Sequence, residues 1–164
     1  EAASFKKQRQ LTSERRKEID KELGSVQAFS FPEQVVQLLQ FFARHMAPSE
    51  LKESTEADII GRVSGFLVAA RSSISVDLGP RIGDRFYADL LLRQASESVV
   101  VEFKRARRAA SYEGAAIAQL KSYCKAAKAD AGILVLWSRG GALADKAELV
   151  QADESSPPVW VVGG

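Results

Sequence analysis

The chain has 164 residues, of which 46% are hydrophobic and 27% are charged, and its formal net charge is +2. These values indicate one globular domain with a sizeable core, and with so small a net charge any affinity for a polyanion must come from local clusters of basic residues. A single cysteine, Cys124, and a single histidine, His45, exclude a disulfide framework and a zinc cage of cysteine and histidine within the chain. No apolar run approaches the roughly 20 residues that span a membrane, so we expect a cytoplasmic protein with no membrane partner.

Residues 1–30 are dense in charge and poor in apolar side chains. This composition predicts a charged helical extension or linker ahead of a domain over residues 31–164. The chain begins at Glu1 and not at a methionine, so we expect it to be part of a longer polypeptide.

Two helices are predicted next. Phe31, followed by proline and glutamate, opens the first, which carries apolar residues on one side and ends at Pro48. Ser49 or Thr55 can cap the second helix, which runs to about Arg71.

Three strands follow, at residues 73–78, 86–92 and 99–104. Turn residues lead from the first into the second, and a short polar break separates the second from the third, so we expect these strands to pair antiparallel. The rest of the chain is predicted as an alanine-rich helix at 111–128, a strand covered on both faces at 131–137, a short helix at about 142–150 and a strand at 159–162. This order of elements defines an α/β sandwich with a mixed central sheet flanked by helices.

Three charged residues lie inside hydrophobic, strand-like runs. Asp89 is followed by three leucines, and Glu102 and Lys104 flank a phenylalanine that follows three valines. Strand alternation places Glu102 and Lys104 on one face. Burying such charges is costly unless a shared partner compensates them, and a hard divalent cation is a partner that binds carboxylate oxygens. The pattern predicts a metal-dependent phosphodiesterase.

Each of these charges has a structural alternative. An edge strand with a solvated face would accommodate Glu102 and Lys104, and a buried Asp89 could be satisfied by backbone groups or an arginine. Asp77 and Asp84 are the nearest rivals to Asp89, but Asp77 lies on the polar side of its strand and Asp84 lies among turn residues.

The three residues resemble the motif of the PD-(D/E)xK nuclease superfamily, whose core has the same order of helix, three strands, helix and strand. Asp89 matches the aspartate on the second strand of that core, and Glu102-x-Lys104 matches the triplet on the third. Ala88 stands where the superfamily name has proline. The resemblance covers about residues 50–137.

The resemblance implies a restriction-endonuclease-like fold and a divalent metal site. Asp89, Glu102 and the carbonyl of Phe103 would hold Mg²⁺, for which Mn²⁺ can substitute. Lys104 would position the attacking water and stabilise the charge that develops on the phosphate. Glu56 would bind a second metal or accept the proton of the water.

Two further candidates depend on helix faces. Glu56 lies within the apolar stripe of its helix, although the helix dipole also favours an acid in the first turn. Gln119 and Tyr123 resemble the Gln-x-x-x-Tyr element of several branches of the superfamily, in which Gln119 would bond a phosphate or orient Lys104. A polar margin on an amphipathic helix is the alternative.

A basic run follows the third strand and supplies candidate contacts to nucleic acid. Arg105, Arg107 and Arg108 could hold the phosphate backbone, and Tyr123 is added to this set. The alternative is a solvated charged surface, which is what charged runs most often form.

We therefore expect a metal-dependent nuclease that hydrolyses phosphodiester bonds endonucleolytically, on DNA rather than RNA, with a homodimer as one way to cut both strands. The alternative from another class is a catalytically idle module of this fold that binds nucleic acid or a partner protein. A third hypothesis gives the charged N-terminal helix a scaffold role. Metal-dependent nicking of a plasmid distinguishes the enzyme from the module, which would bind in a salt-sensitive way without nicking.

Overall fold

The computed structural model describes residues 14, 16–22, 29–45, 55–82, 86–105, 110–137, 146–150 and 156–163. Their main helices are α2 (Phe31–His45), α3 (Glu56–Ala70) and α4 (Ala110–Ala127). The strands are β1 (Ser75–Leu78), β2 (Arg81–Ile82), β3 (Phe86–Tyr87), β4 (Leu90–Gln94), β5 (Glu97–Arg105), β6 (Ala131–Trp137), β7 (Ala147–Val150) and β8 (Val159–Gly163).

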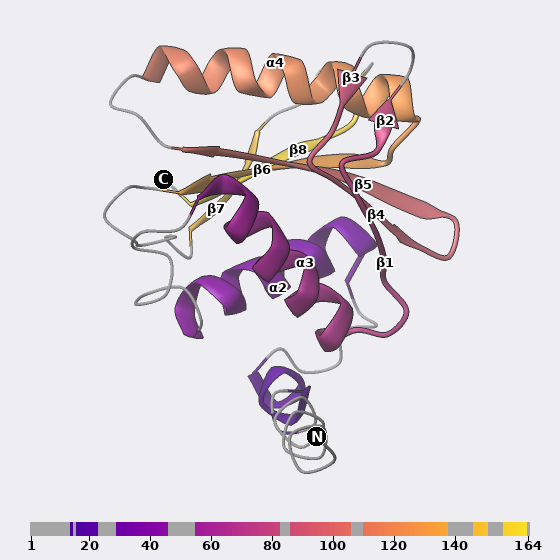
Figure 1. Cartoon of the computed structure of the whole chain (residues 1–164), viewed down its shortest axis with the longest axis vertical. Coiled ribbons are helices and arrows are strands. Elements are labelled where there is room, and N and C mark those ends of the chain that lie inside the picture. Colours follow the sequence, from indigo (N-terminus) through magenta and orange to yellow (C-terminus); the bar gives the residue numbers. More distant parts are fainter. Residues whose placement is uncertain are drawn as a thin grey trace.

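A mixed six-stranded sheet in the order β1-β4-β5-β6-β8-β7 forms the centre, and β2 and β3 form a separate two-stranded ribbon. Helices α2 and α3 cover one face of the sheet, and α4 covers the other (Figure 1). This arrangement confirms the predicted α/β class with a mixed, helix-flanked sheet. None of the helices described is long and apolar enough to cross a membrane.

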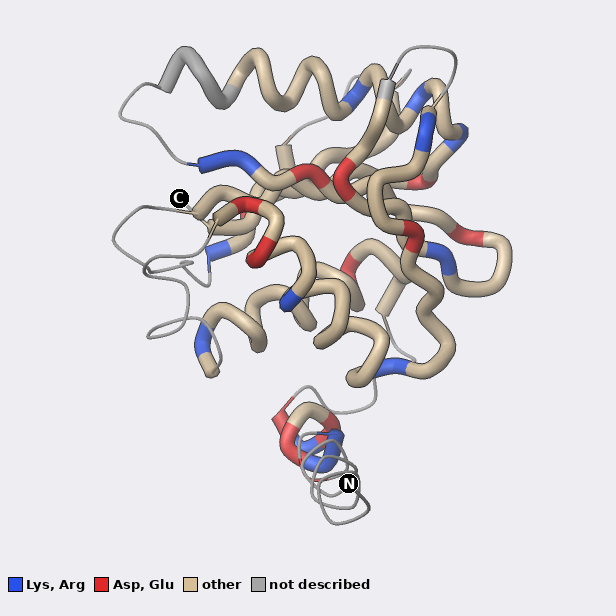
Figure 2. Tube along the Cα trace, in the orientation of Figure 1, with Lys and Arg blue, Asp and Glu red and all other residues tan. Residues whose placement is uncertain are grey.

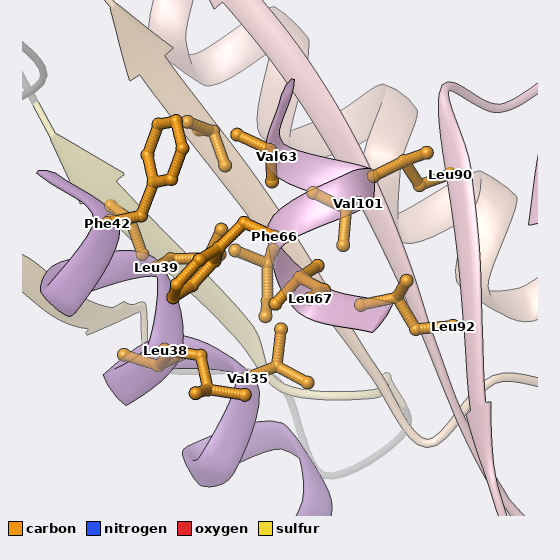
Figure 3. Close-up of a cluster of buried hydrophobic side chains, with 14 of the residues drawn as sticks. Val35, Leu38, Leu39, Phe42, Val63, Phe66, Leu67, Leu90, Leu92 and Val101 are labelled. Carbon is orange, nitrogen blue, oxygen red and sulfur yellow. The ribbon is translucent and has the colours of Figure 1, made fainter. Parts of the chain in front are cut away.

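The start of α3 is fixed by a capping box. The backbone N–H of Asp58 donates to the Thr55 hydroxyl at 3.3 Å, and the Thr55 N–H donates to the Asp58 carboxylate at 3.1 Å. The apolar sides of α2 and α3 face the sheet, where Figure 3 shows them packed against Leu90, Leu92 and Val101 of β4 and β5. Thr55, one of the two residues predicted as the cap, is therefore the cap of α3. It fixes the residue at which α3 begins beside the sheet.

The register of the sheet brings distant segments together. β1, β4 and β5 pair antiparallel, with Leu90 opposite Val101, as the sequence predicted. β5 pairs in parallel with β6, and β6 pairs in parallel with β8, so α4 provides the crossover between β5 and β6. In this register Arg105 and Trp137, the last residues of β5 and β6, are direct neighbours.

Alternation along β5 divides the interior into two cores. Val101 and Phe103 belong to the core under α2 and α3, whereas Val100 belongs to the core under α4. The same alternation places Glu102 on the α4 side of the sheet and Arg105 on the α3 side. The two faces of β5 therefore carry different charged residues near its carboxyl end.

The N-terminal extension is partly packed against the domain. Residues 16–22 are helical, and the Ile19 side chain is only 1% exposed because it joins the core formed by α2 and α3. Asp20 forms an ion pair with Arg71 at 3.1 Å. The other described residues of this helix are exposed, so Ile19 is the apolar side chain that docks it on the core.

The strand predicted at residues 86–92 is interrupted. β3 ends at Tyr87 and β4 begins at Leu90. Between them the Ala88 N–H donates to the carbonyl of Pro80 at 3.1 Å, and the Asp89 carbonyl accepts from the N–H of Gly79 at 2.9 Å. These two bonds keep the antiparallel register that joins the β1–β4 pair to the β2–β3 pair. The predicted strand is therefore split by a bend at Asp89, and Asp89 lies in that bend and not within a continuous strand.

The helix predicted at about residues 142–150 is also wrong over its described part. Residues Ala147–Val150 form β7, which pairs antiparallel with β8 at the edge of the sheet. So short a segment gains little as an isolated helix, whereas pairing with β8 satisfies its backbone groups. Predictions for Pro48, Ser49 and Asp84 concern residues outside the described part of the chain.

Gly132 on β6 tests how closely α4 packs on the sheet. A Cβ at this position would lie 2.7 Å from the Cys124 sulfur and 2.8 Å from Leu120 Cγ, both on α4. We expect Gly132→Ala to lower the free energy of unfolding by about 1–3 kcal/mol in urea denaturation because it overpacks this contact. As the matched control, Gly61→Ala should raise it by about 0.5–1 kcal/mol, since α3 leaves nothing within 4 Å of a Cβ there. A Gly132→Ala protein as stable as the wild type would contradict this packing.

Candidate functional site

Asp89 lies in the bend between β3 and β4 and is half-buried. The bond from Gly79 to its carbonyl fixes the backbone of this bend. Its side chain crosses to the neighbouring strand, where the carboxylate oxygen Oδ2 accepts the backbone N–H of Phe103 at 2.8 Å. Asp89 is therefore held from both its backbone and its side chain.

Glu102 lies on β5, between β4 and β6, and its side chain is only 5% exposed. Its Oε1 accepts the backbone N–H of Asp89 at 2.9 Å. The backbone pairing of β4 with β5 ends at Leu90 and Val101. Beyond that pair, the carboxylates of Asp89 and Glu102 accept the backbone N–H groups in place of backbone carbonyls. Each carboxylate is anchored by the chain segment that carries the other, and the two acids lie side by side.

The electrostatics of this pair are unfavourable without a cation. Burial, followed by the negative charge of Asp89, raises the pKa of Glu102 to about 7, against the lowering effects of the Asp89 N–H and of the positive charge of Lys104. Neither carboxylate forms an ion pair with a lysine or arginine within the described ranges. The site therefore concentrates negative charge that the surrounding protein leaves largely uncompensated.

Lys104 follows Glu102 by two residues on β5 and is half-buried. Alternation puts the two side chains on the same face. The charge of Lys104 lowers the pKa of both Glu102 and Glu56, which indicates that its ammonium group lies near both acids. Phe103, between them, turns its side chain into the opposite core while its N–H bonds to Asp89.

Glu56 is the first residue of α3, and its side chain is exposed. Desolvation raises its pKa, the negative charge of Asp89 raises it further, and the charges of Lys104 and Arg105 lower it. The start of α3 therefore lies close to the carboxylate pair and to the carboxyl end of β5. Figure 2 shows the acidic first turn of α3 next to the basic end of β5. Glu56, which helical periodicity identified as a candidate, therefore lies at the rim of this site.

The α4 candidates lie on the helix that covers the Glu102 side of the sheet. Gln119 donates from Nε2 to the Tyr123 hydroxyl at 2.8 Å, and Tyr123 is buried. Burial raises the pKa of the Cys124 thiol to about 12, and the charge of Glu102 raises it as well, so this part of α4 lies near the acid. Gln119 and Tyr123 are therefore in contact. Among the described contacts, the Gln119 amide bonds to Tyr123 and not to Lys104.

The remaining predicted residues have mixed outcomes. Arg105 stacks on the Trp137 ring, with its guanidinium carbon 4.4 Å from the ring centroid. Arg107 and Arg108 lie outside the described residues. Asp77 is exposed, as expected for the polar side of its strand, and forms an ion pair with Arg93 at 2.6 Å.

Trp137 is a candidate that sequence reasoning missed. It ends a continuous apolar run and was interpreted only as part of a buried strand. The available signal was a large aromatic residue with a polar N–H at the carboxyl end of that strand, where the chain leaves the core.

The donor set suits a hard cation. The paired carboxylates of Asp89 and Glu102, with a backbone carbonyl nearby on β5, offer oxygen ligands of the kind that Mg²⁺ and Mn²⁺ prefer. The part of the chain that is described contains no group of three or more histidine, cysteine, aspartate or glutamate residues arranged for a metal. Any bound ion would therefore need backbone, water or substrate oxygens besides the two carboxylates.

Comparison with known proteins adds no family assignment: no protein-family model matches the chain, and no curated protein matches its sequence.

Because the pKa of Glu102 is raised from 4.5 to about 7, the folded protein holds this proton more tightly than the unfolded chain does. Stability should therefore fall as the pH rises from about 4.5 to about 7 and then level off. Glu102→Gln cannot ionise and keeps an acceptor for the Asp89 N–H. Without divalent cations, we expect its free energy of unfolding relative to wild type to increase by about 2 kcal/mol across this range, measured by urea denaturation. A difference that is independent of pH would contradict the crowded carboxylate pair.

Proposed function

We propose that this protein is a metal-dependent nuclease that hydrolyses phosphodiester bonds in nucleic acid, with DNA favoured over RNA. The observation that carries the proposal is the reciprocal bonding of Asp89 and Glu102, which holds the Asp89 carboxylate beside Glu102 on the strand that also presents Lys104. Two acids that can hold a divalent cation, with a lysine beside them, form a site that can assist hydrolysis of a phosphodiester.

The order of the elements supports a restriction-endonuclease-like fold. Helix α3 precedes the antiparallel strands β1, β4 and β5, and α4 leads from β5 to the parallel strand β6. This is the order of the PD-(D/E)xK core that the motif resembles. Asp89 lies beside β4, and Glu102 and Lys104 lie on β5, which correspond to the second and third strands of that core.

Asp89, Glu102 and the carbonyl of Phe103 are the groups that would hold Mg²⁺ or Mn²⁺. A bound divalent ion would lower the pKa of a water molecule and neutralise charge on the phosphate. The raised pKa of Glu102 is consistent with a site whose favourable state includes a cation, because the protein supplies no ion pair to either acid among its described residues.

The other residues act on the substrate and the water. The ammonium group of Lys104 would stabilise the negative charge that grows on the phosphate in the transition state. Glu56, at the start of α3, would orient the attacking water or accept its proton. Its raised pKa makes its carboxylate a better proton acceptor at neutral pH. Gln119 and Tyr123 would border the site from α4.

The substrate contacts are proposed for the carboxyl end of β5. Arg105, with Arg107 and Arg108, would bind phosphates of the backbone, which fixes position without reading sequence. One site cuts one strand, so cleavage of both strands of a duplex would require two copies of the chain, which a homodimer supplies. We place this activity in the cytoplasm, in line with the expectation from the sequence.

The test is nicking of supercoiled plasmid DNA with Mg²⁺ or Mn²⁺. We expect Lys104→Ala to lower the cleavage rate by about a hundredfold or more, because it removes a cation from the developing charge, while its unfolding curve stays close to that of the wild type. EDTA should abolish cleavage by the wild type.

Lys125→Ala is the matched control, since Lys125 is exposed on α4. This variant should retain the wild-type rate. Undiminished metal-dependent cleavage by Lys104→Ala would rule out the assignment, and binding of DNA in a salt-sensitive way without any nicking would favour the catalytically idle module.

A further inference from the structure

Arg105 and Trp137 form a pair at the carboxyl ends of two central strands. They are register neighbours on the parallel strands β5 and β6, whose backbones run about 5 Å apart. The Arg105 guanidinium carbon lies 4.4 Å from the centroid of the Trp137 ring. Stacking of this kind holds a guanidinium plane in a fixed orientation while it leaves the N–H groups at its edge available.

Two hydrogen-bond donors of the pair have no partner in the described part of the chain. Arg105 Nε and Trp137 Nε1 are both buried and have no hydrogen-bond partner. Trp137 is only 4% exposed, so its N–H has little access to water. A buried donor without an acceptor destabilises the folded protein, and two such donors on one stacked pair are unusual for a purely structural contact.

The pair lies next to the carboxylate site. Arg105 directly follows Lys104, and its charge lowers the pKa of Glu56 at the start of α3. Alternation places Arg105 on the α3 side of the sheet, whereas Glu102 lies on the α4 side. A strand of nucleic acid that crosses the carboxyl end of β5 would therefore meet the carboxylates on one face and the donors of Arg105 and Trp137 on the other.

We infer that Arg105 and Trp137 form a phosphate-binding subsite, in which the guanidinium and the indole N–H donate to the oxygens of a phosphate that flanks the one being cleaved. This inference rests on the proposed function for its substrate, a phosphodiester backbone. It adds Trp137, a neutral donor, to the nucleic-acid contacts that the sequence assigned to three arginines and Tyr123.

The chemistry of the pair favours a phosphate over other ligands. A phosphodiester offers two unesterified oxygens with one negative charge, which matches one cationic fork and one neutral N–H. Arg105 forms no ion pair with an acid in the described part of the chain, so its charge is still available. The stacked ring would exclude water from one side of the guanidinium and strengthen its bonds to the phosphate.

The first test measures binding of fluorescently labelled DNA oligonucleotides, single-stranded and duplex, in EDTA, where the proposed nuclease cannot cut. We expect Trp137→Phe to raise Kd by about tenfold or more, because it keeps an aromatic ring at this position but removes the indole N–H donated to a charged acceptor. The matched control is Trp160→Phe, which changes a partly buried tryptophan on β8 and should leave Kd unchanged.

The salt dependence separates the two members of the pair. Arg105→Gln should reduce the slope of log Kd against log salt by about one unit, since one phosphate contact is lost. Trp137→Phe should leave that slope unchanged, because the indole is neutral. A change in folding alone would not produce this difference between the variants.

The second test follows the two indole N–H resonances of the wild-type protein by NMR, and the Trp137→Phe and Trp160→Phe variants serve only to assign them. The resonance absent from Trp137→Phe should shift on addition of the oligonucleotide, while that of Trp160 should not. Sodium phosphate alone should produce the same shift only at far higher concentration. A response to free phosphate without a response to the oligonucleotide would overturn the assignment to nucleic acid.

The two proposals fail in different ways. If the wild type cuts DNA in a Lys104-dependent manner but Trp137→Phe binds it as tightly and the Trp137 resonance does not move, only the subsite is wrong. If no cleavage occurs but oligonucleotide affinity still falls tenfold in Trp137→Phe, the subsite stands and the nuclease proposal fails.

Discussion

The interaction on which the site depends is the exchange of hydrogen bonds between Asp89 and Glu102 at the end of the ladder between β4 and β5. The backbone N–H of Asp89 binds one carboxylate and the N–H of Phe103 binds the other, at 2.9 and 2.8 Å. Backbone donors hold each acid in place without neutralising its charge. The arrangement therefore fixes the geometry of two carboxylates and leaves their repulsion in the folded protein, where a cation can relieve it.

The fold brings the other charged groups to the same place. The capping box at Thr55 fixes the start of α3, which sets Glu56 beside the carboxylates. The parallel register of β5 and β6 brings Arg105 against Trp137 on the opposite face from Glu102. The charged residues of both sheet faces and of α3 thus lie close together at the carboxyl end of β5. A polyanion and its metal would bind together at this position.

The sequence predicted much of this and missed the rest for identifiable reasons. Local patterns identified α2, α3, the antiparallel strands and β6, and two neighbouring strands with period-two alternation were enough to bring Asp89 and Glu102 together. The bend at Asp89 was not predictable, because it lies where the backbone pairing with β5 ends and the Asp89 N–H binds the Glu102 side chain instead. The contact of Arg105 with Trp137 was missed because it depends on the register of strands joined by a long crossover, which no local pattern encodes.

The central claim, that Asp89 and Glu102 together form a cation site, is tested most directly by X-ray crystallography of the protein soaked in Mn²⁺. We expect an anomalous difference peak in contact with oxygens of both carboxylates, at about the 2.0–2.1 Å typical of Mg²⁺, and no peak there in Asp89→Asn. A structure in which the carboxylates point apart, or in which a lysine or arginine side chain occupies the space between them and no manganese binds, would contradict it.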